Sequence, residues 1–214
     1  MLELEAKQQT KISSWVTATW DEFAKITADP AYAKARCYYN NGQMRIETMP
    51  VGADHASDNG IIHFAIGLFC TLRGIPHKGL INCSYRKNGI REFQPDISYY
   101  LNENLQSAPF GSSVVNLDRT PVPDLVIEIS HTTLADDKEA KLLLYQDVSV
   151  PEYWLVNVEK MEILAFKIAD RDREKITQSQ VLSGLEISIL EQALQRSRQS
   201  DQSKTGAWLL SQFQ

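Results

Sequence analysis

The sequence lacks the features that most readily assign a protein to a functional class. No run of about 18 apolar residues occurs, so we expect no transmembrane helix and no membrane partner. There is no Walker-type loop and no Gly-x-Gly-x-x-Gly motif, which are the usual signs of nucleotide binding. A Gly-x-Ser-x-Gly elbow is also missing, which argues against a serine hydrolase built on that turn. The function must be sought in less obvious residue patterns.

Cysteine is scarce. The three cysteines, Cys37, Cys70 and Cys83, form no Cys-x-x-Cys pair and cannot all pair with one another. The first residues, MLELEAKQQTK, lack the basic-then-apolar order of a secretory signal. We therefore expect a cytoplasmic protein whose thiols stay reduced and act as small core residues.

An excess of positive charge is missing as well. The chain has 22 lysines and arginines against 27 aspartates and glutamates, a net charge of −5. Proteins that bind nucleic acid through its phosphates usually present a basic face, which here would have to be local. The negative net charge counts against tight non-specific DNA binding. Acidic metal ligands in a cleft would also make the net charge more negative.

The length allows one sizeable core. With 214 residues, 43% of them apolar, the chain fits one large domain more easily than two. We expect a loosely ordered N-terminal segment at 1–14, a single domain at 15–195, and a polar C-terminal tail with a short apolar turn at 196–214.

Helical and extended patterns alternate along the predicted domain. A Thr-x-x-Glu capping box at Thr19 predicts a helix to about Asp29, and Asn41-Gly42 between strand-like residues predicts a hairpin. Apolar residues at helical spacing predict a long helix from His55 to Arg73. The later elements are expected strands at about 80–86, 95–101 and 123–130, a helix at about 136–147, and strands in EYWLVNV and MEILAFKI. A crossover helix joins parallel neighbours, so this order predicts an α/β fold with a mixed sheet and helices on its faces.

Two carboxylates occupy unusual places in these strands. Asp96 begins one strand in QPDISYY, and Glu128 lies inside the apolar strand LVIEIS. A buried carboxylate is costly unless it is paired or binds a cation. Carboxylates on neighbouring strands could share one Mg²⁺, with Lys141 of the next helix as the positive group near a nucleophile. The alternative is a salt-bridged pair of Glu128 and Lys141 that carries no activity.

The segments QPDISYY, PVPDLVIEIS and DDKEAKLLLYQDVSVPEYWLVN resemble the Uma2 (DUF820) family. That family is similar to the PD-(D/E)xK nuclease superfamily, whose restriction-endonuclease-like core has the order helix, three strands, helix, strand. The resemblance covers roughly residues 15–195 and is most specific at 120–158. It implies a fold that agrees with the order of elements predicted above.

The resemblance also implies roles for single residues. Asp96 matches the aspartate of the superfamily motif and Glu128 its second acid, and both are implied metal ligands together with the carbonyl oxygen of Ile129. Ser130 stands where the motif has its lysine. Several branches of the superfamily take that lysine from the following helix, where Lys141 matches.

Three further positions are possible accessory residues, because the superfamily often adds an acidic or polar group from a hairpin or helix before the sheet. Glu47 and His55 both precede or begin the long predicted helix, and His55 could contact phosphate or water. Gln94 lies two residues before Asp96, on the same face of the strand. The same two-residue step places Ser130 on the face of Glu128.

The resemblance implies a divalent-metal-dependent endonuclease that hydrolyses DNA phosphodiester bonds. Its cofactor would be Mg²⁺, with Mn²⁺ as a substitute, and nuclease relatives commonly act as homodimers. The second hypothesis is a nuclease-fold protein without catalysis, which serves as a nucleic-acid-binding or regulatory module. Ser130 and the acidic balance favour this second hypothesis, whereas Asp96, Glu128 and Lys141 favour the enzyme.

Overall fold

The chain forms two compact units. The computed structural model describes residues 14–130, 137–170 and 172–214. Among these residues, the first unit comprises 14–50, 83–94 and 111–120, and the second comprises 51–82, 95–110 and the described residues from 121 to 214. The sequence predicted one domain at 15–195, and the contacts of the described residues group into two units because two short excursions from the second unit return to the sheet of the first. Such discontinuous pairing leaves no linker composition in the sequence.

The first unit is built on a six-stranded sheet of order β1-β3-β2-β6-β5-β8. The β2–β3 turn has positive φ at Asn41 (45°) and Gly42 (90°), which suits a tight hairpin and confirms the predicted one. Helix α2 packs Phe23 against Tyr39 and Ile46 of this sheet. The elements are β1 (Val16–Thr17), α2 (Trp20–Thr27), η1 (Pro30–Tyr32), β2 (Arg36–Asn40), β3 (Gln43–Glu47), β5 (Tyr85–Lys87), β6 (Arg91–Phe93) and β8 (Val115–Asn116).

Helix α2 begins as its sequence predicts. The Thr19 hydroxyl accepts a hydrogen bond from the Glu22 N–H, and the Glu22 carboxylate accepts one from the Thr19 N–H. These hydrogen bonds lower the pKa of Glu22. The reciprocal bonds satisfy backbone donors that the first helical turn leaves unpaired, so the capping box sets the start of the helix.

The second unit contains a mixed six-stranded sheet of order β12-β11-β10-β9-β7-β4. Strands β9 and β10 are parallel, as the crossover predicted, and the other neighbours are antiparallel. The elements are α3 (Ala53–Arg73), β4 (His77–Ile81), β7 (Ile97–Leu101), η2 (Asn102–Ser107), β9 (Leu125–Ser130), η3 (Asp137–Lys141), α5 (Leu142–Asp147), β10 (Glu152–Asn157), β11 (Glu162–Ala169), β12 (Asp172–Ile176), α6 (Ile187–Gln199) and α7 (Gln202–Phe213).

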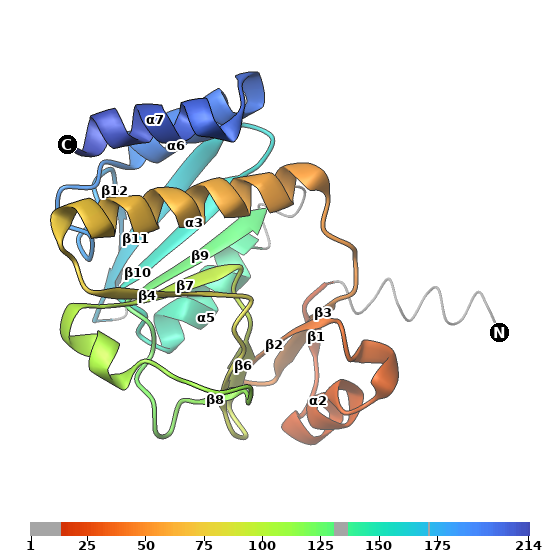
Figure 1. Cartoon of the computed structure of the whole chain (residues 1–214). Coiled ribbons are helices and arrows are strands. Elements are labelled where there is room, and N and C mark those ends of the chain that lie inside the picture. Colours follow the sequence, from red (N-terminus) through yellow and green to blue (C-terminus); the bar gives the residue numbers. More distant parts are fainter. Residues whose placement is uncertain (1–13, 131–136, 171) are drawn as a thin grey trace. The chain divides into compact units, whose positions relative to one another are not determined.

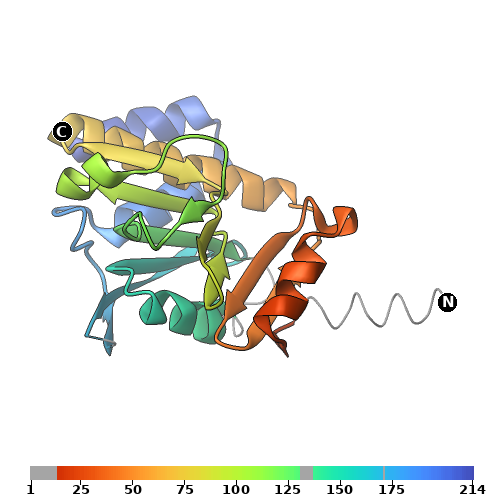
Figure 2. The ribbon, with the colours of Figure 1, turned by 90° about the horizontal axis from the view of Figure 1, so that it is seen from below.

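Helices cover both faces of this second sheet. Helices α3, α6 and α7 lie on one side and α5 lies on the other (Figures 1 and 2). Ile62 of α3, Leu190 of α6 and Leu209 of α7 share a core with Ile127 of β9 and Trp154 of β10. The order α3, β4, β7, β9, α5, β10 confirms the predicted mixed α/β core of helix, three strands, helix and strand.

Three local assignments differ from the sequence prediction. The strand expected at 80–86 is β4, which ends at Ile81, and Tyr85 already belongs to the first unit. The helix expected at 136–147 runs, among the described residues, as the π-helical η3 and then α5. The expected polar tail contains α7, because Thr205, Leu209 and Phe213 recur every four residues and bury one face of a helix.

No helix within the described parts of the chain has both the length and the apolar character needed to cross a membrane.

Candidate active site

The two predicted carboxylates lie across one pair of neighbouring strands. Strand β7 runs antiparallel to β9 with Ile97 opposite Ile127. Asp96 lies in a bend immediately before β7, and Glu128 follows Ile127 in β9, so both residues lie next to the last pair of the two strands. Both side chains are buried, with 0% of Asp96 and 1% of Glu128 exposed. The fold therefore brings together the two residues that the sequence singled out.

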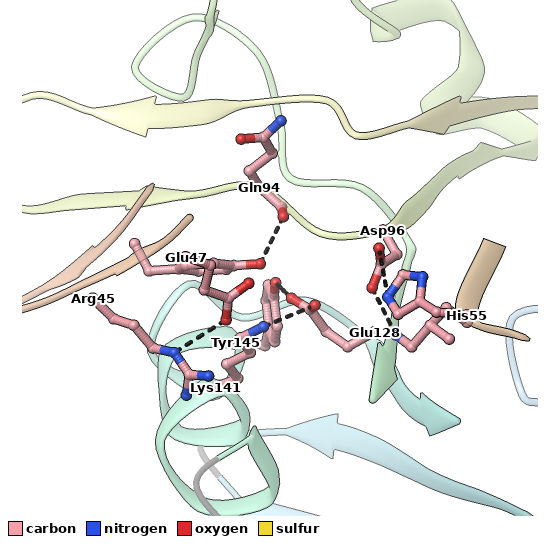
Figure 3. Close-up of polar contacts among 10 residues, drawn as sticks. Arg45, Glu47, His55, Gln94, Asp96, Glu128, Lys141 and Tyr145 are labelled. Atoms are coloured by element: carbon pink, nitrogen blue, oxygen red, sulfur yellow. Dashed lines mark hydrogen bonds and ion pairs between the residues drawn. The ribbon is translucent and has the colours of Figure 1, made fainter. Parts of the chain in front are cut away.

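Asp96 is held by a backbone amide and lies beside a histidine. Its Oδ2 accepts a hydrogen bond of 2.7 Å from the N–H of Ile129 on β9. Its Oδ1 lies 3.4 Å from Nε2 of His55, which belongs to the first turn of α3 (Figure 3). Pro95 has no N–H to donate to the hydrogen-bond ladder of the sheet, and it lies just before β7, where no such bond is needed. These contacts tie the start of β7 to the end of β9 and place His55 at the same carboxylate.

Glu128 has two partners from the helix that follows β9. The Nζ of Lys141 lies 3.0 Å from Glu128 Oε2, and the hydroxyl of Tyr145 donates to Oε1 at 2.5 Å (Figure 3). Lys141 ends η3 and Tyr145 lies in α5. A spacing of four residues places two side chains on one face of a helix, so both can reach the same carboxylate. The ion pair that the sequence predicted as one alternative is present.

Tyr145 is a site residue to which sequence reasoning assigned no role. The signal was present, since Lys-x-x-x-Tyr at 141–145 already placed the tyrosine one turn after the lysine. Its ring also stacks on Tyr153 of β10, with ring centroids 5.0 Å apart and an interplanar angle of 29°. This contact holds the phenol against the sheet and orients its hydroxyl toward Glu128.

The remaining predicted residues fall into two groups. Ser130 lies two residues after Glu128 on β9, so it shares that face of the strand, and it is buried. Ile129 contributes its N–H to Asp96. Glu47 and Gln94 belong to the first unit. There Glu47 pairs with Arg45 Nε at 3.0 Å, and the Gln94 carbonyl accepts a hydrogen bond from the Tyr38 hydroxyl at 2.8 Å (Figure 3).

The aspartate of a second Pro-Asp pair, Pro123-Asp124, connects two segments of the chain through hydrogen bonds. Asp124 Oδ2 accepts hydrogen bonds from the Leu101 N–H at 2.7 Å and from the Asn104 side chain at 3.1 Å. Burial raises the pKa of Asp124, and these hydrogen bonds oppose the rise. Asp124 therefore joins the end of β7 to the segment before β9.

The donor set of the site suits a hard cation. Among the described residues, no group of three or more His, Cys, Asp and Glu side chains could hold a metal ion. Mg²⁺ does not require such a group, because it typically takes one or two protein carboxylates and completes its shell with water and phosphate oxygens. Asp96 and Glu128 offer carboxylate oxygens and Ile129 offers its backbone carbonyl oxygen. All three candidate ligands are therefore oxygen atoms. These residues fit Mg²⁺ better than a thiolate- or imidazole-binding metal.

Comparisons with known proteins agree with this geometry. A crystal structure of "a putative nuclease belonging to DUF820" from Anabaena variabilis is similar in fold. It has a TM-score of 0.56 and 18% sequence identity, and the match covers 83% of this chain and 99% of that one. No curated protein matches the chain. The model of the Uma2 family, described as "Putative restriction endonuclease", matches residues 20–202. Because this match spans most of the sequence, the chain belongs to the Uma2 family.

Proposed function

We propose that this protein is a divalent-metal-dependent endonuclease that hydrolyses phosphodiester bonds of DNA. The observation that carries the proposal is the pair of buried carboxylates, Asp96 just before β7 and Glu128 in β9, with Asp96 bound to the N–H of Ile129, the residue after Glu128. The nuclease-like fold and the membership of the Uma2 family support this reaction class. Lys141 beside Glu128 adds the cation that phosphodiester hydrolysis needs near the developing charge.

The proposed metal ligands are Asp96, Glu128 and the carbonyl oxygen of Ile129. A bound Mg²⁺, or Mn²⁺ in its place, supplies a Lewis acid that polarises the phosphodiester and lowers the pKa of a bound water. Asp96 is already oriented for this role by the Ile129 N–H. The two carboxylates bring two negative charges to the ends of the paired parts of β7 and β9, which favours a divalent cation over a monovalent one.

Lys141 is the proposed catalytic lysine. An ammonium group carries three donors, so one lysine can contact Glu128 and also a water or a phosphate oxygen. Ser130 occupies the motif position two residues after Glu128, and its hydroxyl can orient a water but is a poor base. The proton-accepting and charge-stabilising work therefore falls to groups other than Ser130.

His55 is the proposed accessory residue at Asp96. Its Nε2 lies 3.4 Å from Asp96 Oδ1, and only 13% of its side chain is exposed. An imidazole in this position orients the carboxylate, and its protonated form attracts a phosphate. Glu47 and Gln94 remain predicted accessory residues from the first unit, with Gln94 linked to Asp96 through Pro95.

The proposed substrate is duplex DNA, and the proposed active form is a cytoplasmic homodimer. A duplex has two antiparallel strands, and a dimer with two-fold symmetry presents one site to each of them. Equilibrium sedimentation, with and without a duplex, measures the assembly. A protein that cleaves both strands at one place while remaining a monomer would contradict this part of the proposal.

Calorimetry and plasmid cleavage together test the proposed function. We expect the wild type to bind Mg²⁺ or Mn²⁺ at millimolar concentration or below, and to nick or linearise plasmid DNA. Asp96→Ala should lose both properties, whereas Glu103→Ala, which removes an exposed carboxylate of the same unit, should keep both. A wild type that binds no divalent ion at millimolar concentration would show that the metal mechanism is wrong. Lys141→Ala that cleaves like the wild type would remove only the assignment of Lys141.

One observation favours the second candidate function, a binding module without catalysis. Lys141 and Tyr145 together compensate the buried charge of Glu128 without any metal ion. A protein that binds DNA but neither takes up divalent cations nor cleaves would support this alternative.

A further inference from the structure

Helix α3 begins without a side-chain cap. Its N-cap residue is Gly52, which has no side chain to accept a hydrogen bond from the first turn. The first N–H groups of a helix have no partner within the helix, so an uncapped start is held less firmly than a capped one. His55 lies in this first turn, with its Nε2 3.4 Å from Oδ1 of Asp96. The position of His55 at the proposed site therefore depends on what else holds the start of α3.

Arg198 of α6 binds the start of α3 at two points. Its Nη2 donates a hydrogen bond of 2.8 Å to Oδ2 of Asp58, and its Nη1 forms an ion pair with Asp54. Asp54 lies one residue before His55, and Asp58 lies three residues after it. A planar guanidinium presents several donors in a fixed geometry, so it can hold two carboxylates at once. One side chain of α6 thus connects the two turns of α3 that flank His55.

Asp58 is fully buried, and Arg198 compensates its charge. None of its side chain is exposed. Its Oδ1 accepts no hydrogen bond within the described part of the chain, so the carboxylate depends on the guanidinium at Oδ2. Burial raises the pKa of Asp58, whereas the charge of Arg198 and, more weakly, that of His55 oppose the rise. A buried carboxylate is costly unless it is paired, so the start of α3 is stable in this position only while Arg198 is present.

Asp58 and His55 are neighbours on one side of α3. Residues three apart lie next to each other on a helix surface, and helical side chains lean toward the N-terminus. Asp58 therefore leans toward the turn of His55, and the effect of the His55 charge on Asp58 agrees with this placement. A series of neighbouring groups thus leads from Arg198 through Asp58 and His55 to Asp96.

Helix α6 determines where Arg198 points. Leu190 and Leu194 are buried in the core, and Arg198 follows Leu194 by four residues, which places it on the same face of the helix. Arg196, two residues earlier, points elsewhere and lies over the ring of Trp208, 4.4 Å from its centroid. Arg198 belongs to the part of the chain that the sequence predicted to be a polar tail, and the structure connects it to α3.

We infer that Arg198 and Asp58 are positioning residues of the proposed active site, which hold His55 beside Asp96. Neither residue touches the metal or the substrate, and both act through His55. The inference rests on the proposed function for the role of His55 in cleavage, whereas the placement of His55 is measurable without any cleavage.

Plasmid cleavage tests whether Arg198 acts through His55. Arg198→Met and His55→Ala should each lower kcat/KM on the order of 10- to 100-fold, the range for groups that orient a metal ligand. The double variant should be no slower than His55→Ala, because Arg198 cannot position a side chain that is absent. Arg198→Lys should recover part of the loss, since an ammonium can pair with Asp58 but lacks the fork. Arg196→Met removes the same charge from the same helix and should cleave like the wild type.

Histidine ring signals in NMR spectra measure the placement of His55 without any cleavage. The chain has four histidines, so single substitutions assign their Cε1–H signals. At one fixed pH, Arg198→Met should shift or broaden the His55 signal and leave that of His77, on β4, unchanged. Arg196→Met should leave both signals unchanged. Asp58→Asn, which keeps the shape of the side chain, should act like Arg198→Met and replaces it in both measurements if Arg198→Met does not fold.

The two measurements separate this inference from the proposed function. A folded Arg198→Met whose His55 signal matches that of the wild type overturns the inference. So does a double variant whose loss of kcat/KM equals the product of the two single losses, because Arg198 would then act independently of His55. A wild type that does not cleave DNA contradicts the nuclease proposal, and a changed His55 signal in Arg198→Met still supports the positioning role.

Discussion

The contribution of the buried ion pair between Glu128 and Lys141 to the free energy of unfolding can be measured. The two charged atoms lie 3.0 Å apart, and the side chains are 1% and 3% exposed. At an effective dielectric constant of about 20, their attraction is about 5 kcal/mol, and most of it offsets the cost of removing both ions from water. Glu128→Gln leaves a buried ammonium, and Lys141→Met leaves a buried carboxylate. Each change should lower the free energy of unfolding by about 3–5 kcal/mol.

A double-mutant cycle separates the pair from its surroundings. The double variant Glu128→Gln/Lys141→Met leaves neither charge uncompensated, so it should be more stable than the sum of the single losses by about 2–4 kcal/mol. Urea unfolding followed by circular dichroism gives all four free energies, with an osmolyte added if a single variant is only marginally folded. The exposed pair Asp201 and Lys204, whose charged atoms lie 3.2 Å apart, is the control and should show a far smaller coupling.

One result of the double-mutant cycle would contradict the interaction between Glu128 and Lys141. Additive losses, within about 0.5 kcal/mol, would mean that Glu128 and Lys141 do not interact in the folded protein. The placement of Lys141 beside the proposed metal ligand would then be refuted, and with it the proposed role of Lys141 in catalysis.

Three further predictions concern Tyr145, Asp124 and His63. Tyr145→Phe removes a hydrogen bond of 2.5 Å to a buried carboxylate and should cost about 1.5–3 kcal/mol in urea unfolding, so a loss near zero would contradict that contact. Asp124→Ala removes the acceptor of the Leu101 N–H and the Asn104 side chain, so the free energy of unfolding should fall by about 1–3 kcal/mol. Metal binding measured by calorimetry should be retained. Loss of metal binding in a folded variant would place Asp124 in the site. Burial lowers the pKa of His63, so its contribution is fully present above the unfolded pKa of about 6.5 and is lost as pH falls through the folded pKa. His63→Gln should therefore lose less stability than the wild type between about pH 7.5 and pH 5 in urea unfolding, and equal losses would contradict burial of a neutral imidazole.

Local sequence signals predicted the elements that depend on near neighbours. The capping box at Thr19 and the hairpin at Asn41-Gly42 are both present. Each is decided by hydrogen bonds or φ angles within a few residues, so the chain order alone contains the necessary information. The order of helix, three strands, helix and strand follows from the same signals, together with the handedness of crossover connections.

The polar residues Asp96, Glu128 and Lys141 could be picked out because a carboxylate within an apolar strand needs a partner, and Lys141 in the next predicted helix offered one. The sequence by itself therefore determined the family, the element order and the candidate residues of the site. Only the tertiary structure decided that the Asp96 carboxylate accepts a hydrogen bond from the N–H of Ile129, next to Glu128, and that Lys141 and Tyr145 both contact the Glu128 carboxylate. It also decided that β5, β6 and β8 complete a separate sheet, and that α7 belongs to a core. The physical reason is that register and burial arise from contacts between residues far apart in the chain, whose free energies no local pattern records.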